Sequence, residues 1–146
     1  MRHEHRPGLQ ALQFQEGEQV NVLALCAGVG GMIELPFPPA SLSGHSDKHY
    51  RVMRPIIAKH REWARRAAMA ANLGPFSGAG DIRVCATFYP PDRRSDRVNF
   101  PARLKPYWDG IADAIKVNDR RFLPSYLFAE PVKNARVVIS IEGASV

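Results

Sequence analysis

The chain has 146 residues, which suffices for one domain of ordinary size with a hydrophobic core. Hydrophobic residues make up 45% of the chain and charged residues 23%, a composition that excludes wholesale disorder. No apolar run has the length of a membrane span, and the polar N-terminal region lacks the apolar stretch of a signal peptide. The formal net charge of +6 suits a polyanionic partner.

We expect a cytoplasmic protein without a membrane partner, in which Cys26 and Cys85 are buried thiols. Residues 1–31 differ in composition from the rest, and we interpret them as an appended segment before one domain over residues 32–146. This segment contains the string LALCAGVGG, which resembles the cofactor-binding motif of DNA cytosine-5 methyltransferases. Prolines 36, 38 and 39 are incompatible with the helix that such a motif must open. A methyltransferase-related fragment stays a hypothesis that binding of S-adenosylmethionine would revive.

The first elements of the domain are a short strand, a loop and a helix. Met32–Leu35 is predicted to be a strand that the following prolines stop, and residues 40–53 are predicted to be a polar loop. Arg54-Pro55 then opens a helix with proline at its first helical position, and Asn72–Pro75 ends it. The residues expected on its apolar face are Ile56, Ile57, His60, Trp63, Ala64, Ala67, Ala68 and Ala71.

The second half of the domain alternates between strands and one helix. Asp81–Tyr89 alternates apolar and other side chains, which predicts a half-buried strand. Leu104–Ile115 is predicted to be a helix, and residues 125–130 and 135–142 are predicted to be an antiparallel pair of strands. The apolar face expected for this second helix contains Trp108, Ile111, Ala112 and Ile115. The β-α-β-α-β-β order predicts an α+β fold with two helices and a small mixed or antiparallel sheet of about four strands.

Charged residues gather between the central strand and the second helix. They are Asp92, Arg93, Arg94, Asp96 and Arg97, and Asp119 follows later in the chain. Carboxylates among arginines are often simple salt-bridge partners. The alternative is that the acids hold Mg²⁺ while the arginines hold the phosphates on which the metal acts. The residues by themselves leave both interpretations open.

Four stretches carry a family resemblance through their order and spacing. They are Leu35–Pro39, the loop Ser41–Tyr50 that ends in His49-Tyr50, Pro91–Arg94 followed by Asp96 and Asn99, and Lys105–Ile111 followed by Asn118-Asp119. From about residue 33 to residue 142 the chain thereby resembles the RusA family of Holliday-junction resolvases. Members of this family are small dimeric Mg²⁺-dependent endonucleases, commonly encoded by phages and prophages, that nick four-way DNA junctions symmetrically.

The resemblance implies a role for each matching residue. Asp96 and Asp119 would bind the metal (Mg²⁺ or Mn²⁺), and Lys105 would be the catalytic lysine that stabilises developing charge or helps to protonate the leaving oxygen. The supporting residues would be Asn99, Asp109 and Asn118, and those that grip the DNA backbone would be Arg93, Arg94, Arg97 and Arg103. The implied partners are branched DNA and a second copy of the chain.

Two departures from the family pattern bear on activity. Val98 stands where the family has its second carboxylate. Ala102 stands where the family lysine usually falls, so Lys105 matches only if Phe100–Ala102 is an insertion; Arg103 is the alternative cation. Pro106 supports the insertion, since a helix unbroken from Asn99 would hold this proline in its interior at a cost of about 3 kcal/mol. A catalytically weakened junction-binding or DNA-binding protein of the same fold is therefore the alternative function.

Overall fold

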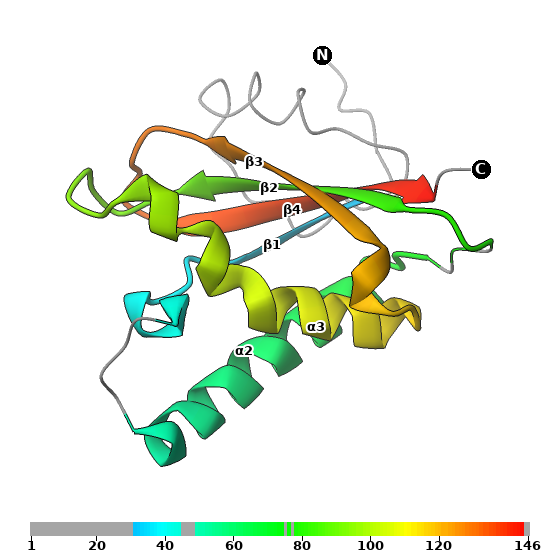
Figure 1. Ribbon diagram of the computed structural model, residues 1–146. Coiled ribbons are helices and arrows are strands. Elements are labelled where there is room, and N and C mark those ends of the chain that lie inside the picture. The colour runs from blue at the N-terminus through cyan, green and yellow to red at the C-terminus, as the bar shows by residue number, and fades with distance from the viewer. Residues whose placement is uncertain (1–30, 45–48, 75, 77, 145–146) are drawn as a thin grey trace.

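The protein folds into a four-stranded sheet with two α-helices on one of its faces (Figure 1). This computed structural model describes residues 31–44, 49–74, 76 and 78–144, without the side chains of the last two. The strands are β1 (Gly31–Pro36), β2 (Ile82–Tyr89), β3 (Phe122–Phe128) and β4 (Arg136–Ala144), and the helices are α2 (Tyr50–Ala70) and α3 (Lys105–Ile115). The predicted α+β class and element order are confirmed. Neither α2 nor α3 has both the length and the apolar character needed to cross a bilayer.

The strand order in the sheet is β1-β4-β2-β3. β4 pairs antiparallel with both β1 and β2, whereas β3 pairs parallel with β2 through the crossover that contains α3. The predicted antiparallel pairing of the last two strands is therefore wrong, because β2 lies between them. The apolar run from Val137 to Ile141 is buried on both faces, which suits an interior strand. β3 carries Pro124 and exposed side chains, which suit an edge.

β2 is buried on both faces of the sheet along most of its length. The predicted inward set (Ile82, Val84, Ala86 and Phe88) belongs to the core between the sheet and the helices, as expected. Cys85, Thr87 and Tyr89 on the opposite face are buried as well, so the prediction of a half-buried strand is wrong beyond Arg83. Cys85 is 5% exposed, so the expected burial of this residue is confirmed. Cys26, with the rest of residues 1–30, lies outside the described residues.

α2 begins five residues before Pro55, which was expected to open it. His49 caps the helix instead, since its Nδ1 accepts a hydrogen bond from the backbone N–H of Arg51 at 3.1 Å. Residues 50–53 are thus helical, and Ala40–Ser43 form a short 3₁₀ helix, η1, where the sequence indicated only a loop. The predicted end is confirmed: Asn72 adopts a positive φ of 56°, and the N–H of Leu73 donates to the carbonyl of Ala68.

The two helices touch backbone to backbone at Gly110 of α3. A Cβ atom at this position would collide with the carbonyl oxygen of Arg61 and lie 3.0 Å from the Cβ of Ala64. The buried residues of α2 are Met53, His60, Ala64 and Ala68, and the side chains that flank them stay more exposed. Ile57 and Trp63, expected on the apolar face, are accordingly 39% and 37% exposed.

Replacing Gly110 with alanine tests this contact. The added methyl group must push α3 away from the backbone of α2, and we expect Gly110→Ala to lower the free energy of unfolding by about 1–3 kcal/mol in denaturant titrations. A second substitution, Ala64→Gly, leaves the Arg61 carbonyl in place and should not restore stability. Full rescue by Ala64→Gly, or an unchanged stability of Gly110→Ala, would contradict this description of the helix contact.

Candidate functional site

The connection from β2 to α3 consists of two short 3₁₀ turns, η2 (Arg97–Asn99) and η3 (Pro101–Leu104). Phe100 anchors this connection in the core, where its ring lies 5.3 Å from that of Phe88 between centroids. α3 then starts at Lys105 with Pro106 in its first turn, as predicted from the proline. The three residues interpreted as an insertion therefore lie outside the α-helix, and the helix presents Lys105 at its N-terminal end.

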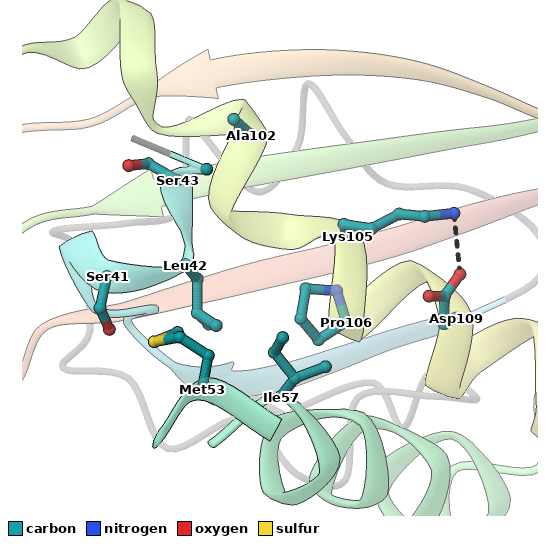
Figure 2. A pocket seen from close by; sticks show the side chains of 10 residues that line it. Ser41, Leu42, Ser43, Met53, Ile57, Ala102, Lys105, Pro106 and Asp109 are labelled. Carbon is teal, nitrogen blue, oxygen red and sulfur yellow. Dashed lines mark ion pairs between the residues drawn. The ribbon is translucent and has the colours of Figure 1, made fainter. Parts of the chain in front are cut away.

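Lys105 contacts two carboxylates. Its Nζ lies 2.5 Å from Oδ2 of Asp119 and 3.0 Å from Oδ1 of Asp109 (Figure 2 shows the second pair). The i, i+4 spacing places Lys105 and Asp109 on one face of α3. Asp119 comes from η4 (Asp119–Arg121), which Asn118 caps by accepting a hydrogen bond from the N–H of Arg120 at 2.9 Å. We refer to Lys105, Asp109 and Asp119 as the Lys105 cluster; it unites three of the predicted site residues, and Asn118 supports it.

The ion pairs fix the charge states within the Lys105 cluster. The hydrogen bond from Lys105 lowers the pKa of Asp119 from its usual value. The hydrogen bonds to Asp119 and Asp109 raise the pKa of Lys105. The lysine is therefore a cation at neutral pH and a poor proton donor. Its side chain is 65% exposed, which leaves the ammonium group accessible to an anionic ligand.

An ion pair between α2 and α3 lies one helical turn beyond Asp109 and was not predicted from the sequence. Asp113, one turn beyond Asp109, accepts hydrogen bonds from Arg61 of α2 at 2.7 and 3.0 Å. The spacing of Asp109 and Asp113 placed both acids on one helix face. The partner from α2 could not be found from the sequence, because only the packing of the two helices brings it there.

Asp96 directly precedes η2 in the segment before α3. It is exposed, and its Oδ1 caps η2 by accepting a hydrogen bond from the N–H of Val98 at 3.1 Å. Asn99 follows in the same exposed turn, and its N–H donates to the carbonyl of Asp96. Across the described ranges, neither a hydrogen bond nor an ion pair joins Asp96 to Asp119. Two carboxylates do not form an ion pair with each other in any case, so the expected pairing of Asp96 and Asp119 in one metal site stays a prediction.

The carboxylates of Asp109 and Asp119 fit a metal site that needs only two protein ligands. Within the part of the chain that the structure describes, no three His, Cys, Asp or Glu side chains gather in a way that could hold a metal ion. Mg²⁺, however, binds through one or two carboxylates and completes its shell with water and phosphate oxygens. Asp109 and Asp119 already converge on one positively charged atom, so they have the donors and the arrangement to share one cation.

The arginines of the segment before α3 occupy exposed positions. Arg93 pairs with Glu130, and both side chains are more than two-thirds exposed. Asp92 accepts a hydrogen bond from the backbone N–H of Arg94 at 2.9 Å and so shapes the turn. Arg97 is exposed in η2. Exposed ion pairs are weak, so these guanidinium groups are available to phosphates at little energetic cost.

Arg103 does not share this position. Its side chain is buried, its Nη1 donates to the carbonyl of Pro38 at 3.1 Å, and its guanidinium group lies 5.0 Å from the ring centroid of Phe100. Burial lowers its pKa. Arg103 therefore ties η3 to the chain after β1, and its predicted roles as a DNA-backbone contact and as the alternative cation are wrong.

A cavity of about 400 Å³ opens beside the Lys105 cluster, where η1, α2, η3 and α3 meet (Figure 2). Lys105 and Asp109 belong to its lining. This cavity could not be predicted from the sequence, because its walls come from four separate elements of the chain.

Substitution of Arg103 tests its assignment to the interior. We expect Arg103→Ala to lower the free energy of unfolding by about 1–3 kcal/mol, because the buried stem and the hydrogen bond to Pro38 are both lost. The control Arg97→Ala removes an exposed side chain and should change stability by less than about 0.5 kcal/mol. Equal losses measured by denaturant unfolding would contradict the assignment.

Comparison with known proteins places the chain beside a bacterial relative. No family model matches the sequence. A protein of Xylella fastidiosa (strain Temecula1 / ATCC 700964), described as an uncharacterized protein, is 38% identical over 131 residues. The match covers 83% of this chain and 84% of the Xylella protein. At this identity and coverage, the chain belongs to the same family as the Xylella fastidiosa protein.

Proposed function

We propose that the protein is a Mg²⁺-dependent, structure-selective DNA endonuclease of the RusA type, which resolves four-way junctions by symmetric nicking in DNA recombination and repair. One observation carries the proposal: a lysine and two carboxylates converge at the exposed N-terminal end of α3, in a protein with a net charge of +6. Phosphodiester hydrolysis uses acids to hold a metal and a cation to stabilise the charge of the transition state. The reaction would take place in the cytoplasm.

Asp109 and Asp119 are the residues that would hold the metal. Asp109 joins Asp119 in this proposal because both carboxylates contact the same atom, whereas Asp96, the ligand that the family resemblance implies, caps η2 with one of its oxygens. When bound, Mg²⁺ would supply Lewis-acid stabilisation and an activated water. Val98 leaves the segment before α3 with one acid fewer than the family has, which makes the two acids of the Lys105 cluster the better candidates.

Lys105 acts as a fixed cation in this proposal. Its ammonium group is charged at neutral pH, as in any exposed lysine, and it contacts both carboxylates at the N-terminal end of α3. A phosphate next to it would gain electrostatic stabilisation as negative charge develops on its oxygens. Protonation of the leaving oxygen, the other role considered for this lysine, is disfavoured by its raised pKa.

The DNA would be held by the exposed arginines Arg93, Arg94 and Arg97, which precede α3 in the chain. Contacts of this kind go to phosphates and give affinity without reading the sequence. Two coordinated nicks across a junction require two active sites related by a two-fold axis, so we propose that the protein works as a homodimer.

The second candidate is a junction-binding protein of the same fold with weakened catalysis. The observation that favours it is Val98, whose side chain is 81% exposed at the position of the family's second carboxylate. An exposed valine there would leave the basic surface intact while removing a metal ligand. Tight binding of a junction without nicking distinguishes this candidate from the first.

The first prediction of the proposal concerns the two acids of the Lys105 cluster. With a labelled four-way junction and Mg²⁺, we expect Asp109→Asn and Asp119→Asn each to slow nicking by about 100-fold or more, because each removes a ligand and a charge at the reacting centre. Junction binding should survive in both variants. The matched control is Asp113→Asn, one turn further along the same face of α3, which should nick within a few-fold of the natural protein.

Normal nicking by Asp119→Asn would exclude the Lys105 cluster as the active site. Loss of nicking in Asp96→Asn alone would instead assign the metal site to the segment before α3. Tight junction binding by the natural protein without nicks, with either Mg²⁺ or Mn²⁺, would establish the second candidate function.

The second prediction concerns the exposed arginines. Loss of one phosphate contact in Arg93→Ala, Arg94→Ala or Arg97→Ala should flatten the dependence of log K on log salt by roughly 0.9 for duplex DNA. Fluorescence anisotropy over a series of salt concentrations measures this slope. Arg66→Ala on α2 is the control, because its side chain is 75% exposed and paired with Glu62. A slope that stays unchanged in all three variants would assign the arginines to a solvated loop.

A further inference from the structure

The cavity beside the Lys105 cluster has apolar walls that face one another. Figure 2 shows Leu42 of η1, Met53 and Ile57 of α2, and Pro106 of α3 pointing toward one another. The volume of about 400 Å³ falls within the range of roughly 300–1,000 Å³ that is typical of small-molecule sites. Apolar walls of this kind favour a flat, weakly hydrated group over a charged one.

Polar groups lie at the edge of the same cavity. Lys105 and Asp109 line it, and the Lys105 side chain extends from there toward Asp109 (Figure 2). Ser41 and Ser43 of η1 belong to the lining as well. A ligand that fills the cavity therefore meets apolar surface in its interior and a cation at its edge. The cation belongs to the proposed active site, so the ligand and the scissile phosphate would be neighbours.

The first turns of α2 carry positive charge and an aromatic ring. Tyr50, Met53 and Ile57 are spaced so that they share one helix face. Tyr50 is 67% exposed, and the guanidinium group of Arg54 lies 5.6 Å from its ring centroid. Arg51 is exposed in the same turn, and it lines a separate hollow of α2 together with Arg54, Pro55 and Ala58. Exposed aromatic rings among basic side chains are typical of surfaces on which unpaired bases stack while their phosphates are neutralised.

We infer that this cavity binds an unpaired nucleobase of the DNA strand whose phosphate lies at the Lys105 cluster. The inference rests on the proposed function. The faces of the base would lie against Leu42, Met53 and Pro106, and its polar edge would meet the serine hydroxyls. A base in a regular duplex is stacked and paired, whereas a base at a branch point is extruded at a lower cost. The cavity thereby makes the enzyme select branched DNA over a linear duplex.

A fluorescent base analogue tests the inference without cleavage. The probe is a four-way junction that carries 2-aminopurine at the branch point, and the reference is a linear duplex with 2-aminopurine at an internal position, both in buffer with a chelator and no divalent metal. Binding of the natural protein should raise the emission of the junction several-fold, because the base leaves its quenching stack. The emission of the duplex should not change.

Ala102→Phe is the variant that fills the cavity, since Ala102 is exposed at its rim and no core residue is disturbed. We expect it to abolish the rise in emission and to weaken junction binding about tenfold, with duplex binding unchanged. The matched control is Ala70→Phe at the exposed C-terminal end of α2, which should behave like the natural protein. Circular dichroism of both variants shows whether the fold is retained.

The outcomes separate this inference from the proposed function. Junction binding without a rise in emission, or a rise that Ala102→Phe retains, would overturn the base-binding role and leave the endonuclease proposal standing. The protein could instead form a dimer that Ala102→Phe disrupts, with no rise in emission. This result would show that a second copy of the chain fills the cavity and would overturn the inference too. A protein that binds neither DNA would refute the proposed function and the inference together.

Discussion

The close contact between α2 and α3 at Gly110 determines where the charged side chains of the protein lie. A backbone carbonyl of α2 occupies the space that a side chain at position 110 would need. This close packing therefore sets the distance between α2 and α3. Lys105, Asp109 and Asp113 lie on one face of α3, so the helix contact determines their positions relative to α2. The same contact brings Arg61 to Asp113 and leaves the cavity between the N-terminal ends of the two helices.

The secondary structure could be predicted from local signals where these signals are strong. The predictions of the apolar face of α3 and of the end of α2 were correct, because periodicity and helix-ending residues act locally. The start of α2 was misplaced, since the capping nitrogen of His49 has no distinct signature in the sequence and Pro55 was the more visible signal. The pairing of the last two strands was wrong because the order of strands in a sheet depends on which of them can be buried on both faces.

The candidate site, too, could be predicted from the sequence only in part. Lys105, Asp109 and Asp119 were named from the family resemblance, and the structure brings them together. Arg103 was expected to contact the DNA backbone or to serve as the alternative cation, yet its buried guanidinium group donates to the carbonyl of Pro38, a partner that only the fold reveals. Asp96 was expected to share a metal with Asp119, and this stays a prediction; the structure adds that its Oδ1 accepts a hydrogen bond from the N–H of Val98. Tertiary packing thus decided which charged residues meet.

The central claim is that Asp109 and Asp119 form the metal site, and metal binding in the absence of DNA tests it most directly. Mn²⁺ titrated into the natural protein and into Asp109→Asn, Asp119→Asn and Asp96→Asn can be followed by isothermal titration calorimetry. We expect a binding isotherm for the natural protein and for Asp96→Asn, and weakened binding in the two variants of the Lys105 cluster. Binding that is lost in Asp96→Asn and unchanged in the other two would contradict it.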